Sequence, residues 1–185
     1  FTKLGIEEGI AISLNNIGKV YNSWGQYDKA IEHYQQALAI TRKLRMEGHI
    51  AVRLNNIGEV YIKRGEYEKA IENFREALAI DRKLRRKDKI ATRLNNIGMA
   101  YNSLGQYDKA IEYYQEALAI ARKLGTDDRI ASVLSNIGAA YYFGVVYYGQ
   151  QQYVPAIKYL VESIDLKEKL RKTATGNARR DYLAS

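Results

Sequence analysis

The sequence predicts an all-α solenoid in which antiparallel helix pairs stack side by side. A Leu-Asn-Asn-Ile-Gly motif begins at residue 14 and returns at residues 54 and 94, and a Leu-Ser-Asn-Ile-Gly version begins at residue 134, so the period is 40 residues. The chain of 185 residues contains one proline, which leaves long helices uninterrupted. A fixed period of this length indicates repeated units, each of which buries its apolar face against its neighbours.

Each unit carries apolar residues at helical spacing twice, which predicts two helices. In the first unit these helices are expected at about residues 10–24 and 27–45, with Gly25 in the chain reversal between them. Gly18 stands in the middle of the first helix, where glycine costs about 1 kcal/mol relative to alanine. We therefore expect a close approach of the two helices there. The residues expected on the facing sides are Leu14, Ile17, Gly18 and Tyr21 of the first helix, and Ala30, Tyr34, Ala37 and Leu38 of the second.

The period sets the boundaries of the expected units. Residues 1–5 align with the end of a second helix at 121–125, so the chain is expected to begin inside a repeat and to be part of a longer array. The predicted organisation is the end of a preceding repeat helix at 1–9, repeats at 10–49, 50–89, 90–129 and 130–172, and a C-terminal extension toward a further domain at 173–185.

The fourth unit contains six extra residues, because the stretch 137–142 is followed by a similar stretch at 143–148. Six residues at about 100° each rotate the apolar face by roughly 120°. One interpretation is that the helix breaks near Gly144 and the surplus forms a bulged turn. The other is an exposed aromatic face that packs on a second chain, giving a homo-oligomer. Its candidate residues are Tyr141, Tyr142, Phe143, Tyr147 and Tyr148.

Composition argues against several kinds of function. The absence of cysteine excludes disulfides, thiolate metal sites and a cysteine nucleophile, and neither His33 nor His49 has a partner at ligand spacing. No catalytic residue, metal site or cofactor is therefore predicted. No apolar run reaches the roughly 18 residues of a membrane-spanning helix, so no membrane partner is expected. A cytoplasmic location is expected instead.

The motif residues carry a family resemblance. Leu14, Ile17, Gly18, Tyr21, Ala30, Tyr34 and Ala37 resemble the signature positions of the tetratricopeptide repeat, whose usual length is about 34 residues. Six further residues around 42–47 lengthen the unit, as in the subclass of kinesin light chains, Pins-type adaptors and many bacterial arrays. The stretch 173–183 also resembles the segment that joins such bacterial arrays to a CHAT peptidase-like domain. The resemblance covers about residues 1–172 and implies a right-handed superhelix that binds a protein or peptide segment in its concave groove.

The groove is expected on the side of the first helices opposite their core face. Its candidate residues are Asn15, Asn16, Lys19 and Asn22 in the first unit, Asn55, Asn56, Glu59 and Lys63 in the second, Asn95, Asn96, Met99 and Asn102 in the third, and Asn136 in the fourth. Asn16, Asn56, Asn96 and Asn136 form a ladder with one rung per repeat. An amide both donates and accepts hydrogen bonds, so each rung can pair with the backbone of an extended peptide. The alternative is that the asparagines bond to neighbouring helices and only fix the stacking, as Asn15, Asn55 and Asn95 are well placed to do.

Two other functions stay open. The array could be a structural spacer or an oligomerisation module for an effector domain. The net charge of +8 also allows an acidic partner, because basic residues gather at the second-helix ends, where they complement the helix dipole. No aromatic residues interleave with them, so nucleic acid is not expected. The residues of this basic ridge are Arg42, Lys43, Arg45, Arg82, Lys83, Arg85, Arg86, Lys87, Lys89, Arg122 and Lys123.

Overall fold

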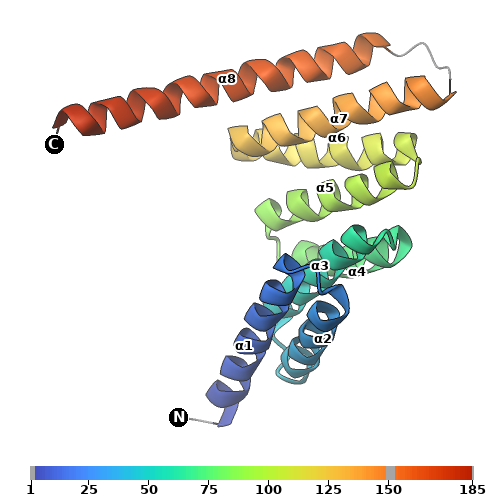
Figure 1. Ribbon diagram of the computed structural model, residues 1–185, viewed down its shortest axis with the longest axis vertical. Coiled ribbons are helices and arrows are strands. Elements are labelled where there is room, and N and C mark those ends of the chain that lie inside the picture. Colours follow the sequence, from blue (N-terminus) through green and yellow to red (C-terminus); the bar gives the residue numbers. More distant parts are fainter. Residues whose placement is uncertain (1–2, 149–152, 185) are drawn as a thin grey trace.

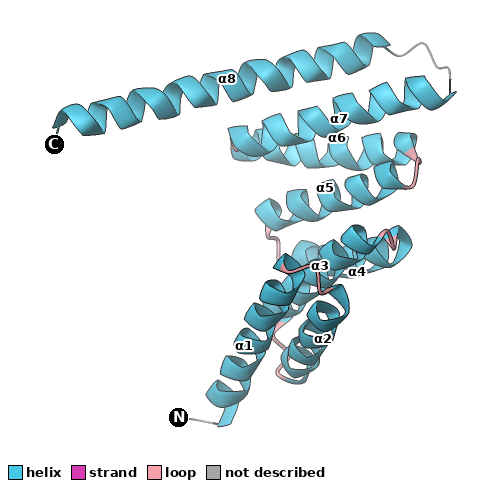
Figure 2. Ribbon diagram, in the orientation of Figure 1, coloured by secondary structure: helices cyan, strands magenta, loops and turns pink. Residues whose placement is uncertain are grey.

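The computed structural model describes residues 3–148 and 153–184, with the side chains of 4–144 and 154–175. Throughout these residues the regular structure is helical, which confirms the all-α prediction. Each helix packs on the next along the stack, so that α1 lies at one end and α8 at the other (Figures 1 and 2). The helices are α1 (Lys3–Ser23), α2 (Tyr27–Lys43), α3 (Glu47–Arg64), α4 (Tyr67–Lys83), α5 (Lys87–Ser103), α6 (Tyr107–Leu124), α7 (Asp127–Tyr148) and α8 (Tyr153–Ala184).

The turns inside the first three helix pairs confirm the role expected of Gly25. Gly25, Gly65 and Gly105 have φ of 73°, 76° and 72°, a left-handed conformation that glycine adopts without steric cost. The turns between pairs use the same conformation with different residues. Gly125 has φ 64° after α6, whereas Arg45 and Arg85 take φ 53° and 56° at the equivalent positions.

Replacing Arg85 by glycine is expected to stabilise the fold by about 0.5–1 kcal/mol. A non-glycine residue in the left-handed region costs roughly 1–2 kcal/mol, and glycine removes this cost. Part of the gain in stability is offset because glycine has greater conformational freedom in the unfolded chain. Arg85 forms no ion pair with any residue the structure describes, so its charge contributes little to the folded state. The measurement is the urea midpoint of the Arg85→Gly variant. Gly125→Arg should shift the midpoint the other way, and equal midpoints for the two variants would refute the argument.

The predicted close approach of the two helices is present in every pair, against an aromatic ring in the first three and against Leu160 in the fourth. A Cβ placed on Gly18 would lie 2.7 Å from the Tyr34 ring, and one on Gly58 would lie 2.5 Å from the Phe74 ring. Ala30 and Ala37, the small residues expected nearby, are fully buried. In the first three pairs the glycine of the first helix therefore makes room for a large buried side chain of the second.

Two expected boundaries differ from the structure. Residues 3–9 continue α1 without interruption instead of ending a preceding helix. The break expected near Gly144 is also wrong, because α7 runs through this residue to Tyr148. The extension expected from residue 173 is helical to Ala184 as part of α8, and its lead toward a further domain stays a prediction. Gly5 and Gly144 remain helical because glycine permits a left-handed turn but does not impose one.

Candidate functional site

Four of the predicted groove residues meet around one hollow between α3 and α5. The hollow has a volume of about 280 Å³ and is lined by Glu59, Ile62, Lys63, Phe74, Asn96 and Met99. Phe74 is buried and comes from α4, where its ring packs under Gly58. Ile62 and Met99 complete an apolar floor, while Glu59, Lys63 and Asn96 provide polar groups around it. This arrangement suits an apolar side chain whose neighbouring backbone is polar.

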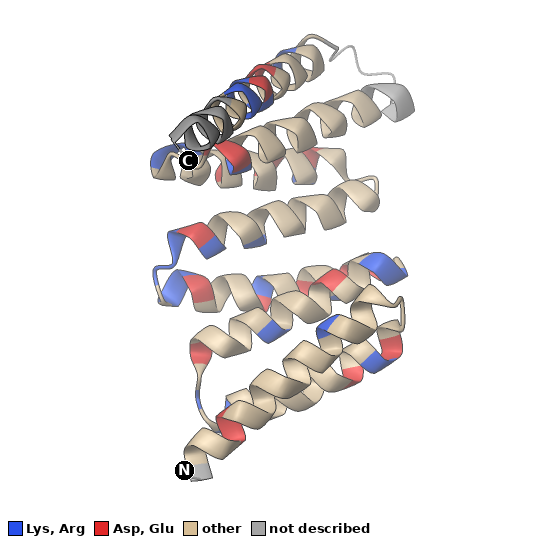
Figure 3. Cartoon of the chain, turned by 60° about the vertical axis from the view of Figure 1, so that its left-hand side comes forward, with Lys and Arg blue, Asp and Glu red and all other residues tan. Residues whose placement is uncertain are grey.

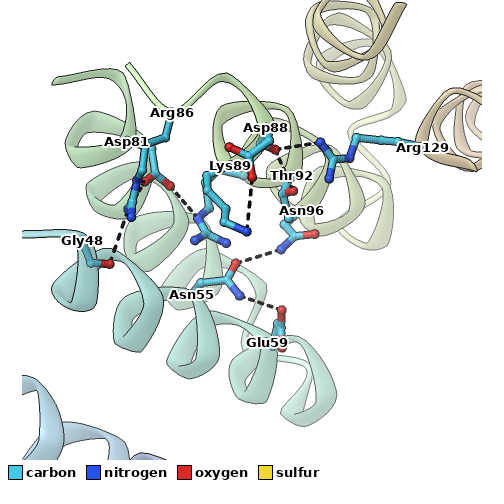
Figure 4. A network of polar contacts seen from close by, with 11 residues as sticks. Gly48, Asn55, Glu59, Asp81, Arg86, Asp88, Lys89, Thr92, Asn96 and Arg129 are labelled. Carbon is cyan, nitrogen blue, oxygen red and sulfur yellow. Dashed lines mark hydrogen bonds and ion pairs between the residues drawn. The ribbon is translucent and has the colours of Figure 1, made fainter. Parts of the chain in front are cut away.

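The ladder asparagines are connected from one repeat to the next. The Nδ2 of Asn56 donates to Oδ1 of Asn15 at 2.8 Å, that of Asn96 donates to Asn55 at 3.0 Å (Figure 4), and that of Asn136 donates to Asn95 at 2.9 Å. Each bond uses one of the two N–H groups of the rung. No described residue pairs with the Oδ1 atoms of these three rungs, and the bond fixes how each amide is turned.

Other predicted groove residues also bond to one another. Asn55 donates to Oε1 of Glu59 at 2.7 Å (Figure 4), and the Lys63 ammonium donates to Oδ1 of Asn22 in the preceding repeat at 2.9 Å. Asn95 contacts the sulfur of Met99 at 3.5 Å. Asn16 and Lys19 are exposed on α1. These contacts and the lining of the hollow link eight of the predicted groove residues, and Asn15 and Asn55 are buried. The linked residues are Asn22, Asn55, Glu59, Lys63, Asn95, Asn96, Met99 and Asn136.

The side chains that lie beneath this surface differ in polarity from one repeat to the next. Tyr34 of the first repeat is buried beside Asn22. The equivalent residues of the third repeat are Tyr114, which is buried, and Asn102, whose Oδ1 is buried without a hydrogen-bond partner among the described residues. Burial, followed by the charge of Glu59, raises the pKa of Tyr34 to about 12, and the hydrogen bond with Asn22 opposes that rise. Burial also raises the pKa of Tyr114.

In the second repeat both members of this pair are apolar, since Ile62 replaces the asparagine and Phe74 replaces the tyrosine. The hollow is therefore the apolar section of a surface that is polar on both sides.

A buried ionic cluster joins the second and third repeats, and the sequence did not reveal it. Asp81 of α4 is 0% exposed. Its Oδ2 accepts from Nε of Arg93 at 3.1 Å, and its Oδ1 accepts from Nε of Arg86 at 2.8 Å and also from Nη2 of Arg86. Arg86 reaches on to the carbonyl of Gly48 in α3 (Figure 4). Burial lowers the pKa of Arg93, and the opposing charge of Asp81 counters that effect.

The repeats on either side do not repeat this pairing. Thr41 and Arg53 occupy the places of Asp81 and Arg93 one repeat earlier, and Ala121 and Val133 occupy them one repeat later. Arg53 is buried, its Nε has no hydrogen-bond partner, and burial lowers its pKa. An unusual acid at an otherwise small or apolar position of the second helix is the only sequence signal that points to this cluster.

The basic ridge is largely paired with acids. Arg42 binds Glu76, Arg82 binds Glu116 and Arg122 binds Glu162, at 2.7, 2.7 and 2.5 Å, and each of these ion pairs joins two successive second helices. Lys43 likewise binds Glu7 at 2.8 Å, and Lys83 binds Glu47. Figure 3 shows basic and acidic segments lying close together along the helices. This pairing lowers the net charge that the ridge can offer an acidic partner.

Some aromatic residues of the insertion pack against other helices of the same chain. Tyr141 stacks on Tyr159 of α8 with ring centroids 5.8 Å apart, and Phe143 stacks on Tyr107 of α6 at 6.2 Å. Tyr142 is half exposed. The side chains of Tyr147 and Tyr148 lie outside the described residues.

Two further kinds of feature are absent from the described residues. No group of histidine and acidic side chains there could hold a metal ion. No helix in the same part of the chain is long and apolar enough to cross a bilayer.

Solved structures share this architecture. BtubC (BKLC) from P. vanneervenii matches with a TM-score of 0.77 and 24% identity over 87% of this chain and 64% of its own. The putative kinesin light chain repeats of Podosopora anserina match with a TM-score of 0.71 and 21% identity over 88% of this chain and 76% of theirs. A Rap protein complexed with Competence and Sporulation Factor gives 0.71 and 22% over 91% of this chain and 45% of its own. This chain therefore spans less than two thirds of the length of BtubC and of the Rap protein.

The sequence comparisons identify the family of this chain. A comparison with curated proteins found no match. The family model described as tetratricopeptide repeat matches residues 9–83 and 89–169, which is most of the sequence. With the 40-residue period and the stacked helix pairs, this match shows that the chain belongs to the tetratricopeptide repeat family.

Proposed function

We propose that this chain is a non-catalytic protein–protein interaction scaffold that holds an extended peptide along its asparagine ladder, with an apolar peptide side chain in the hollow between α3 and α5. The observation that carries the proposal is the hollow itself, because Ile62, Phe74 and Met99 form an apolar floor beside a rung of the ladder, Asn96. Among the structural neighbours, the Rap protein is complexed with Competence and Sporulation Factor, so this fold accommodates a partner.

The rungs supply backbone recognition. Asn56, Asn96 and Asn136 each keep a carbonyl oxygen and one N–H that bond to no described residue, and the inter-repeat bond holds each amide in a fixed orientation. A fixed amide loses little rotational freedom when it binds, which favours association. Three rungs at about 1 kcal/mol each and one buried apolar side chain at about 2–3 kcal/mol give about 5–6 kcal/mol. This total lies between the free energies of millimolar and micromolar binding.

The test is to select peptides from a random displayed library on the parent protein and to measure their binding to matched variants by calorimetry. Selected peptides should share one apolar residue at a fixed position. The Ile62→Asn/Phe74→Tyr variant installs the pair that the first and third repeats already carry, so it should fold while binding at least about tenfold more weakly. Failure to select any peptide, or equal binding by parent and variant, would contradict the proposal.

A structural spacer is the second candidate, favoured by the amide bonds between repeats. The same calorimetry separates the two functions. Substituting the rungs (Asn56→Ala/Asn96→Ala/Asn136→Ala) removes both the inter-repeat bonds and the clamp, whereas Asn15→Ala/Asn55→Ala removes two of the bonds and leaves the rungs. A clamp predicts that the rung variant loses binding, and that the second variant, which keeps the rungs but frees two of them to rotate, binds more weakly than the parent and more tightly than the rung variant. A spacer predicts that both variants lose stability to a similar extent and that no peptide binds to the parent or to either variant.

A further inference from the structure

Two side chains that lie one turn apart on α3 each have a buried nitrogen without a hydrogen-bond partner among the described residues. The atoms are Nε of Arg53 and Nδ1 of His49. Arg53 is only 5% exposed. Residues four apart on a helix are neighbours on one face, so these two side chains share a face of α3. Buried polar groups without partners are uncommon and costly, which makes this pair a candidate for binding a ligand that accepts hydrogen bonds.

The next repeat shows which chemical group satisfies this arginine. Arg93 is the equivalent of Arg53, and its Nε donates to Oδ2 of Asp81 at 3.1 Å. Thr41 takes the place of Asp81 one repeat earlier, and its hydroxyl donates to backbone carbonyls of its own helix at 3.0 Å. Asp81 opposes the effect of burial on the pKa of Arg93, whereas no acid does so for Arg53. Arg53 therefore lacks the carboxylate that its equivalent has.

The equivalents of His49 also have partners. Lys89 forms an ion pair with the carboxylate of Asp88 at 3.3 Å, and Arg129 donates to the backbone carbonyl of Asp88 at 2.9 Å (Figure 4). All three repeats therefore place a nitrogen donor at this position. Only in the second repeat do both positions of the face carry a donor that no described residue satisfies.

Acids at the start of α1 and α3 do not supply the missing carboxylate. Glu7 pairs with Lys43 at 2.8 Å, and Glu47 pairs with Lys83. Glu8 forms an ion pair with neither of the two side chains in the part of the chain that the structure describes. His49 also lies in the first turn of α3, which begins at Glu47. The positive end of the helix dipole therefore adds to the attraction for an anion.

We propose that Arg53 and His49, at the start of α3, bind a carboxylate group, supplied either by a small carboxylate ion or by an acidic side chain. The planar guanidinium matches the two oxygens of a carboxylate, as the contact of Arg93 with Asp81 illustrates. The small exposed fraction of Arg53 limits the ligand to a group of this size. This site is separate from the hollow between α3 and α5 and does not depend on the proposed peptide function.

The direct test is a titration of protein labelled with ¹⁵N-arginine, observed by NMR at the Nε–H of Arg53. This resonance is identified by its absence from the Arg53→Val variant. Sodium acetate should shift it saturably, with a dissociation constant on the order of 1 mM, while the Nε–H of Arg93 should stay in place because Asp81 already accepts from it. Sodium chloride at equal concentration should leave both resonances unchanged.

A second titration identifies the source of the carboxylate. Its probe is aspartate with acetylated and amidated ends, which carries one side-chain carboxylate in a peptide setting. Tighter binding of this probe than of acetate indicates an acidic side chain as the ligand, and weaker or equal binding indicates a free ion. If neither probe shifts the resonance, or if chloride shifts it as much as acetate does, the proposal is overturned.

Two variants copy solutions that other repeats already use. Arg53→Val installs the residue found at Val133, and Thr41→Asp supplies an internal carboxylate as Asp81 does. Acetate should raise the urea midpoint of the parent relative to chloride, because a ligand that binds only the folded state stabilises it. It should not raise the midpoint of Arg53→Val, and Thr41→Asp should bind acetate at least about tenfold more weakly than the parent.

A third variant, His49→Ala, tests the second donor and should bind acetate about tenfold more weakly than the parent. Circular dichroism before each measurement shows whether the variants keep the helix content of the parent. Because Thr41→Asp retains the Arg53 resonance, its NMR titration decides the question even if Arg53→Val does not fold. Binding of acetate by Thr41→Asp as tight as that of the parent would overturn the proposal, since the site would then lie elsewhere.

Discussion

Replacing Asp81 by alanine is expected to destabilise the fold by about 3–5 kcal/mol, the largest effect of any single substitution considered. The change leaves Arg93 buried beside Arg86 without the carboxylate that pairs with both of them. Breaking a buried ion pair by removing one partner carries this cost because the remaining charge stays out of water. The measurement is urea unfolding followed by circular dichroism, with a lower midpoint for the Asp81→Ala variant.

The chain supplies its own control for this prediction. The next interface along the stack has Ala121 and Val133 at the equivalent positions, both buried. The Asp81→Ala/Arg93→Val variant copies that pair, and replacing a buried ion pair by apolar residues is often neutral or stabilising. The double variant should therefore recover most of the stability that Asp81→Ala loses. A double variant as unstable as the single one would show that the effect comes from the cavity left by Asp81 and not from the charge of Arg93.

The period of 40 residues was enough to predict the helices in the middle of the array. The second helix expected at 27–45 is α2 at Tyr27–Lys43, and the glycine expected in the turn is there. These predictions succeeded because each repeat is surrounded by copies of itself, so local pattern and packing agree. The predictions were weaker for residues 3–9 and for the fourth unit, where alignment with a turn or a duplication suggested a break. Gly5 and Gly144 both stay inside helices, because a glycine ends a helix only when the chain beyond it turns.

The residues of the candidate site were also predicted only in part. Glu59, Lys63, Asn96 and Met99 were predicted from their helical spacing, and they line one hollow. The buried cluster of Asp81 and Arg93 was not predicted, because an arginine in a first helix is typical of an exposed position. Only the packing of α4 against α5 determines that Arg93 meets an acid there. A sequence gives the residue types of a face, whereas burial depends on which neighbour covers it.

Replacing Gly98 by alanine is expected to destabilise the fold by about 1–3 kcal/mol, even though alanine is the better helix former. Its Cβ would lie 2.6 Å from both Cδ1 and Cε1 of Tyr114, closer than carbon atoms approach in folded proteins. The ring cannot easily move away, because Tyr114 is buried among the apolar residues of the third and fourth repeats. Overpacking a filled core costs this much because neighbouring side chains and backbone must shift. The urea midpoint of Gly98→Ala should therefore fall.

Gly9 provides the matched control, since it also lies inside a first helix but a Cβ there would meet nothing within 4 Å. Gly9→Ala should raise stability by up to about 1 kcal/mol through helix propensity alone. The same chemical change is thus expected to have opposite signs at two helical glycines, and the sign at each depends only on what the second helix presents. If both substitutions stabilised the protein, the recurring glycine would not be required for the approach of the aromatic ring, and the motif would need another explanation. If both destabilised it, backbone flexibility would be the property that these glycines contribute.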